Sequence, residues 1–485
     1  MVAVNSSLTN RAAQAYGATN ARTELGRWRT DMADRFDARY AAGVLDEDPP
    51  EPPRPRVRAL PGEAWALRGT VLTPHRQLND AYVEVHGDRI ARVTTKRPAA
   101  ATVIDTQGAV ILPGLIDLHG HPEYNVFAAW EAPRRYANRY AWRRSREYAA
   151  VVKEPWKRLT DEPSLLRTLT RYAEARALVG GTTAIQGASA KYPGREEALV
   201  RNVDRRIFGE HRARSIIDLG RTDAADAARL RDQVAAGTVT AIYVHLAEGV
   251  DETSAKEFAD LADANLLLPA TVIIHGTALD RAGFGDMRDA GAKLVWSPQS
   301  NLRLYGATTD VASALELGVP VALGADWLPS GSPSLLAELQ VARRALAAQG
   351  VDIGARRLVR MVTSQAAEVA GLAHHLGKVA SGRIADLVVL DRRASDPWES
   401  VLASGPPEVA LVAIGGDVAY ARPDWMADLL GEEAVSQLES VMAWGRPMSV
   451  DTLYSLLAPQ EPPPRLEQLR ADLIARYPQT GPIWA

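Results

Sequence analysis

Between residues 112 and 373 the chain repeats one pattern, in which short apolar runs alternate with stretches of helical periodicity. This alternation is typical of parallel strands joined by crossover helices. A closed barrel needs eight such strands. The sequence supplies seven, at Val110–Leu118, Thr182–Gln186, Ser215–Leu219, Thr240–Leu246, Thr271–His275, Lys293–Trp296 and Val319–Gly324. We therefore expect an α/β fold with a (β/α)8 barrel of the TIM type, whose eighth strand is either distorted or hidden in residues 205–212.

Short strand-like runs also lie on both sides of the barrel region. They are Trp65–Leu72, Ala81–Val85, Arg89–Val93 and Thr102–Asp105 before it, and residues 377–391, Val409–Ile414 and Val418–Tyr420 after it. We expect both groups to form one small β-sandwich. The predicted organisation is a helical arm with a Pro-rich linker (1–56), the first part of the sandwich (57–111), the barrel (112–375), the second part of the sandwich (376–421) and a C-terminal helical extension (422–485).

The composition is that of an ordinary globular protein, with 46% hydrophobic and 24% charged residues. The net charge of −3 gives no sign of a nucleic-acid partner. No apolar run approaches the roughly 20 residues that span a bilayer, and residues 1–17 lack the apolar segment of a secretory signal. We expect a soluble, cytoplasmic protein that acts on a small molecule, with no membrane or nucleic-acid partner.

The absence of cysteine limits the chemistry of the chain. It excludes disulfides, thiolate ligands and a cysteine nucleophile. A metal would therefore be held by histidine and carboxylate, which suits Zn²⁺, Fe²⁺ or Mn²⁺.

The first apolar run of the barrel region ends in a His-x-His pair, His119 and His121. In an extended strand, residues i and i+2 point to the same side. Two imidazoles placed together in this way form half of a metal site, and the C-terminal end of a barrel strand is where barrel enzymes place their chemistry. The alternative is a strand end that merely carries two polar residues.

Three later runs also end in polar side chains that suit a metal site. They supply His245 with Glu248 three residues beyond it, His275, and Asp326. Four of the nine histidines thus lie at strand ends, a placement that chance does not readily produce. The structural alternatives are a helix-start carboxylate for Glu248, a core histidine for His275 and a helix N-cap for Asp326.

At these motifs the chain resembles the amidohydrolase superfamily and, within it, the branch of cytosine deaminase, guanine deaminase and the triazine hydrolases. The matching segments follow the family's order from about residue 57 to 420. They are Pro113–His121, Gly181–Thr183, His245–Glu248, His275, Ser297–Leu304, Leu323–Asp326 and Gly382–Leu390.

The resemblance implies one divalent metal held by His119, His121, His245 and Asp326, with zinc favoured over iron or manganese. Relatives with two metals generally bridge them with a carboxylated lysine on the fourth strand. This chain has seven lysines and none between Lys191 and Lys256, which supports a single metal and leaves a carboxylate-bridged pair of metals as the alternative. Relatives are often dimers or larger, so we also expect a homo-oligomer.

The resemblance further implies hydrolysis of carbon–nitrogen bonds by a metal-activated water, with deamination of an amino-heterocycle favoured. In that mechanism Asp326 accepts the proton of the water, Glu248 shuttles protons, and His275 hydrogen-bonds the water or substrate. Hydrolysis of a linear or cyclic amide is the alternative. An inactive scaffold is a third reading, which the intact ligand positions disfavour.

Two loops carry candidates for substrate contact, namely Tyr124, Trp130 and Trp327, which follow the expected ligands in sequence. The segment 130–147 is rich in arginine and aromatic residues. It could cover the site and hold an anionic or a ring-shaped group. We favour the alternative, an amphipathic helical segment whose aromatic side chains pack inward.

Overall fold

The computed structural model describes residues 64–99, 102–187, 199–204, 207–208, 213–452, 465–480 and 483–484. The predicted N-terminal arm and linker (1–56) lie outside these ranges. Within them, no helix combines the length and the apolar character that crossing a bilayer requires.

Eight short strands, arranged as two parallel sheets, form the barrel-type part of the described chain. The first sheet has β5 (Leu115–Asp117), β6 (Thr182–Ile185) and β7 (Arg201–Asn202), and the second has β8 (Ala213–Ile216), β9 (Ala241–Leu246), β10 (Thr271–His275), β11 (Lys293–Trp296) and β12 (Val321–Leu323). An isolated parallel bridge between Gly120 and Asp326 links the end of β12 to the end of β5. The two sheets therefore meet where the predicted site lies.

The strand missing from the sequence prediction is β7, only two residues long and placed just before the expected segment 205–212. Two residues are too few to show any periodicity. The predicted run Val110–Leu118 also proved to be two strands, since β4 (Thr102–Pro113) ends before β5 begins.

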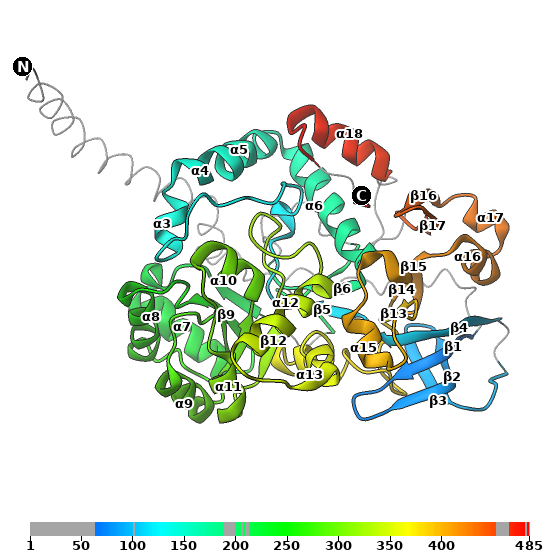
Figure 1. Ribbon diagram of the computed structural model, residues 1–485, viewed down its shortest axis with the longest axis horizontal. Helices are drawn as coiled ribbons and strands as arrows, with labels where there is room; N and C mark the ends of the chain where they lie inside the picture. The colour runs from blue at the N-terminus through cyan, green and yellow to red at the C-terminus, as the bar shows by residue number, and fades with distance from the viewer. Residues whose placement is uncertain are drawn as a thin grey trace, which may run out of the picture. The chain divides into compact units, whose positions relative to one another are not determined.

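Helices follow most of the barrel strands, and Figure 1 shows several of them grouped around β9 to β12. They are α6 (Pro163–Val179), α7 (Ala224–Ala235), α8 (Glu252–Asp263), α9 (Arg281–Ala290), α10 (Pro298–Tyr305), α11 (Val311–Leu317), α12 (Leu335–Ala348), α13 (Gly354–Arg360) and α14 (Ser364–Val369). Asp223, Asp251 and Asp280 cap α7, α8 and α9, because each carboxylate accepts a hydrogen bond from a backbone N–H of the first turn.

The other large element is a nine-stranded sheet in the order β16-β17-β15-β14-β13-β4-β1-β2-β3. Besides β4, its strands are β1 (Trp65–Leu72), β2 (Gln77–His86), β3 (Arg89–Thr94), β13 (Leu387–Leu390), β14 (Val409–Ile414), β15 (Asp417–Ala421), β16 (Glu439–Ala443) and β17 (Arg446–Val450). The antiparallel pair β13 and β4 joins the two ends of the chain, with Val388 opposite Leu112. Both ends share one sheet, as predicted, but the predicted sandwich is not confirmed.

The C-terminal region differs from the purely helical extension that the sequence predicted. It contains α16 (Pro423–Leu430), α17 (Glu432–Val435) and α18 (Leu466–Arg476), but also the β16–β17 hairpin. The hairpin turns at Trp444 and Gly445, whose φ angles of 50° and 77° are both positive. A two-residue turn with two positive φ angles normally has Asn or Gly first, so Trp-Gly gave no recognisable signal.

Candidate active site

Four side chains at or just beyond the ends of β5, β9 and β12 converge. His119 Nε2 lies 3.1 Å from His245 Nε2 and 3.4 Å from Asp326 Oδ1, and His121 Nε2 lies 3.4 Å from His245 Nε2 and 3.6 Å from Asp326 Oδ1. Ligand atoms of a tetrahedral zinc, each about 2.0–2.1 Å from the ion, lie about 3.3 Å from one another. These four separations are close to that value, and the ligand atoms of His119, His121 and Asp326 all lie within 4.8 Å of one another, so the cluster suits a single divalent metal.

The protonation of these groups also suits a metal. Burial holds the pKa of His119 and of His245 well below the ordinary value, and it lowers the pKa of His121 to about 3, with His275 and Arg143 adding to the effect. The imidazoles are therefore neutral, which is the form that binds metals. Burial raises the pKa of Asp326 well above its ordinary value. A cation at this position would favour the ionised carboxylate.

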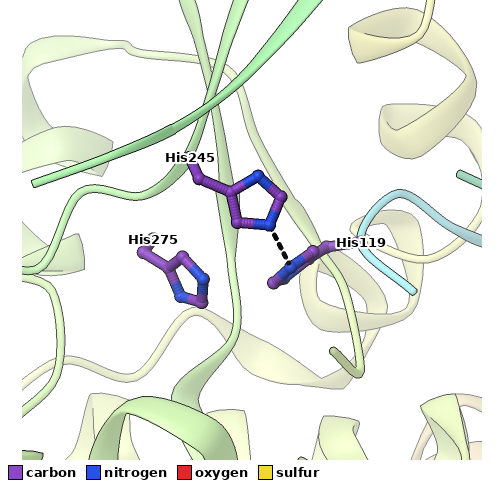
Figure 2. A group of neighbouring side chains, drawn as sticks. All are labelled: His119, His245 and His275. Carbon is purple, nitrogen blue, oxygen red and sulfur yellow. Dashed lines mark hydrogen bonds between the residues drawn. The ribbon is translucent and has the colours of Figure 1, made fainter. Parts of the chain in front are cut away.

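Ser297 fixes the orientation of the first histidine. Its Oγ lies 2.8 Å from His119 Nδ1, and both residues are buried. With Nδ1 engaged, Nε2 is directed toward the other ligand candidates. Figure 2 shows the rings of His119 and His245 turned toward each other, with His275 beside them.

His275 and Glu248 border the metal position. The ligand atoms of His119, His245 and His275 lie within 4.8 Å of one another. Asn301 Oδ1 lies 2.9 Å from His275 Nδ1, so Nδ1 carries the hydrogen and Nε2 presents a lone pair. That Nε2 lies 3.6 Å from Glu248 Oε2, and both side chains are buried.

Left-handed backbone is concentrated at these strand ends. Ala247, His275 and Asp326 have φ angles of 53°, 70° and 60°, a conformation that residues with a Cβ rarely adopt. Backbone strain of this kind clusters at functional sites, because the surrounding structure must hold it in place.

The aromatic candidates lie at different distances from the histidines. Tyr124 has its ring centroid 6.3 Å from that of His121, and Trp327 packs edge-on against Tyr124 at 5.4 Å. Trp130 instead contacts Tyr136, Trp142 and Tyr148, so it belongs to a second layer of aromatic residues.

The segment 130–147 contains α3 (Arg139–Arg143) and part of α4 (Arg146–Tyr148), and η2 (Ala149–Lys153) and α5 (Glu154–Thr160) follow it. Trp130, Tyr136 and Trp142 are buried, in agreement with the inward-packing interpretation. The segment is also attached to the end of β9. Arg139 donates from its guanidinium to the carbonyl of His245 at 2.9 Å, and from its backbone N–H to the carbonyl of Glu248 at 3.1 Å.

Sequence reasoning assigned no role to several residues that support the site. Ser297 and Asn301 belong to the segment 297–304, which was recognised only as a match to the family. Asp117 was also overlooked. Its Oδ1 accepts hydrogen bonds from the backbone N–H groups of His119 and Ala325, each at 3.1 Å, and burial raises its pKa to about 7. Ser297 and Asn301 follow an apolar run and Asp117 ends one, and this position was the sequence signal that could have indicated them.

Comparison with known proteins supports the family resemblance. Residues 221–419 match the model of the amidohydrolase family. The chain is 27% identical over 385 residues to a 5-methylthioadenosine/S-adenosylhomocysteine deaminase of Teredinibacter turnerae, a match that covers 69% of the chain and 84% of the relative. These matches confirm the resemblance and the enzyme class predicted from the sequence, a hydrolase of carbon–nitrogen bonds.

Solved structures support the fold. A triazine hydrolase from Arthrobacter aurescens matches with a TM-score of 0.65 at 18% identity, over 85% of this chain and 99% of that one. A zinc-bound adenosine deaminase from Xanthomonas campestris matches with a TM-score of 0.61 at 19% identity, over 76% and 94%. The chain therefore has a domain of the TIM-barrel type.

Proposed function

We propose that this hydrolase deaminates an amino-heterocycle with one divalent metal, zinc being favoured. His119, His121, His245 and Asp326 would hold the metal. The observation that carries the proposal is the convergence of their donor atoms. The Nε2 atoms of His119 and His121 each lie 3.1–3.6 Å from His245 Nε2 and from Asp326 Oδ1, and Glu248 and His275 lie directly beside them.

The metal would supply an activated water, since coordination can lower the pKa of water to about 7. The residues around it would manage the protons. Asp326 would accept the proton of the attacking water, because its Oδ1 lies among the three imidazoles. His275 would hydrogen-bond the attacking oxygen through Nε2, which the bond from Nδ1 to Asn301 leaves free to accept.

Glu248 would deliver protons to the substrate. Its carboxylate is buried and lies beside His275, so it can reach the reacting group without being a metal ligand. Protonation of a ring nitrogen makes the neighbouring carbon more electrophilic. After water adds to that carbon, a second proton allows ammonia to leave and a carbonyl to form. Both protons come from the attacking water, one by way of Asp326 and the other from the hydroxyl that becomes the carbonyl.

Aromatic side chains would hold the heterocycle. The ring of Tyr124 lies 6.3 Å from that of the proposed ligand His121, and Trp327 packs against Tyr124, so we propose these two for ring contact. Trp130 would act from the second layer, through Trp142 and Tyr148.

Ammonia release tests the proposal. The zinc-loaded protein would be assayed with 5-methylthioadenosine, S-adenosylhomocysteine, adenosine and an amino-triazine. These compounds are chosen because similar proteins are named after them or after their chemical class. We expect stoichiometric ammonia from at least one of them. Release of a carboxylic acid from cyclic amides, with no ammonia from any amino-heterocycle, would replace deamination by amide hydrolysis.

A further inference from the structure

Glu248 is held by a residue from the opposite side of the site. The hydroxyl of Tyr305, the last residue of α10, donates a hydrogen bond of 2.5 Å to Glu248 Oε1. Both side chains are about 95% buried, with Tyr305 and Glu248 each 5% exposed. The other carboxylate oxygen, Oε2, lies 3.6 Å from His275 Nε2. One oxygen of Glu248 is therefore anchored while the other borders the metal position.

A second bond fixes the direction of the first. The indole nitrogen of Trp142 lies 2.8 Å from the hydroxyl oxygen of Tyr305. An indole N–H can only donate, so Tyr305 accepts from Trp142 and must direct its own hydrogen elsewhere, toward Glu248. Burial and the neighbouring charge of Glu248 also hold the pKa of Tyr305 well above its ordinary value, so the hydroxyl stays protonated.

We propose that Tyr305 is a positioning residue that orients the proton-shuttling carboxylate of Glu248, and that Trp142 of the segment 130–147 sets the orientation of Tyr305. This proposal rests on the proposed function of Glu248. A glutamate side chain has several rotatable bonds, and a fixed orientation removes conformations in which Oε2 points away from the substrate. The segment 130–147 thus acts on catalysis through a chain of two hydrogen bonds.

The kinetic test compares two buried tyrosines. Tyr305→Phe removes only the hydroxyl, and we expect kcat to fall about ten-fold or more, as for loss of a hydrogen bond to a charged group, with KM and metal content unchanged. The matched control is Tyr136→Phe. Tyr136 is also buried, and its hydroxyl has no hydrogen-bond partner among the described residues, so we expect an unchanged kcat.

Two further variants test whether the loss of kcat in Tyr305→Phe arises through Glu248. Trp142→Phe keeps Tyr305 but removes its donor, so kcat should fall by a smaller factor, again at constant KM. In a Glu248→Gln background, Tyr305→Phe should change the residual rate less than two-fold, because the carboxylate that it positions is absent. The proposal would be contradicted if Tyr305→Phe lowered kcat as strongly in the Glu248→Gln background as in the wild type, or if Tyr136→Phe lowered kcat as much as Tyr305→Phe does.

A urea-unfolding cycle tests the same contact without any substrate. The unfolding equilibrium constant would be measured for the wild type, Tyr305→Phe, Glu248→Ala and the double variant, all in the zinc-loaded protein. We expect the two substitutions to be coupled by at least about five-fold. Coupling without ammonia release from any tested compound would refute the proposed function but support the contact, whereas independent effects would refute the role of Tyr305 whatever the substrate.

Discussion

Gly324 lies directly against His119. A Cβ built on Gly324 would stand 2.4 Å from the Cβ of His119 and 2.6 Å from its backbone nitrogen. The ends of β12 and β5 approach this closely because the backbone N–H of Asp326 donates to the carbonyl of His119 at 2.6 Å. The same approach brings two proposed metal ligands together.

Gly324→Ala should therefore displace His119. We expect a loss of about 1–3 kcal/mol in the free energy of unfolding, together with most of the bound metal. Elemental analysis and thermal unfolding measure the two effects. The control is Gly285→Ala in the middle of α9, where no atom lies within 4 Å of the new Cβ. It should raise stability by about 0.5–1 kcal/mol. Full metal content and wild-type stability in Gly324→Ala would show that His119 does not need this close approach.

Glu248→Gln should separate proton transfer from metal binding. The amide keeps the shape of the side chain and can still accept the bond from Tyr305, but it cannot shuttle protons. We expect kcat to fall about 10²–10⁴-fold while metal content and the unfolding midpoint stay constant. Ammonia release by the variant at the wild-type rate would remove Glu248 from the mechanism.

Ser297→Ala should weaken the metal site without removing a ligand. His119 would lose the partner that fixes its Nδ1, and loss of such a partner typically reduces metal affinity about 10–100-fold. Competition with a chromogenic chelator gives the affinity. His119→Ala is the reference for complete loss, and a Ser297→Ala affinity equal to that of the wild type would argue against this role.

Glu338 gives a pH dependence of stability. It is fully buried, accepts a hydrogen bond from the backbone N–H of Gln299 at 3.1 Å and bonds to Ser332, and burial raises its pKa from 4.5 to about 8. Between pH 4.5 and about pH 8, the folded state therefore keeps a proton on Glu338 that the unfolded state has already released. The contribution of Glu338 to the free energy of unfolding is therefore full below about pH 4.5 and is lost as the pH rises through about 8.

Glu338→Gln is neutral at every pH, so the variant should gain stability relative to the wild type as the pH rises from 5 to 8. The gain is at most about 1.4 kcal/mol per pH unit for one proton. Urea unfolding at several pH values measures it. A difference between the two proteins that does not change with pH would show that Glu338 is already ionised in the folded state.

The sequence predicted the residues of the candidate site that lie at or just beyond strand ends. His119, His245, His275 and Asp326 each end or directly follow an apolar run, and the boundaries of β10 and β11 agree with the predicted runs residue for residue. Strand periodicity and the position of a polar residue at a strand end are local properties, and local properties can be read from one sequence.

Features that depend on distant segments could not be predicted in this way. Tyr305 and Trp142 are 163 positions apart, and nothing in either neighbourhood indicates that they meet at Glu248. The strand β7 is two residues long and depends on pairing with β6. The β16–β17 hairpin likewise forms through cross-strand pairs, at a turn that begins with tryptophan.

Metal reconstitution tests the single-metal site most directly. The protein would be stripped with a chelator and titrated with Zn²⁺, and the rate of ammonia release from a compound that the zinc-loaded protein deaminates would be followed against equivalents added. We expect negligible activity without metal, a linear rise, and a plateau at one equivalent, with no recovery in Asp326→Ala. Full activity in the stripped protein, or a plateau only at two equivalents, would contradict the single-metal site formed by His119, His121, His245 and Asp326.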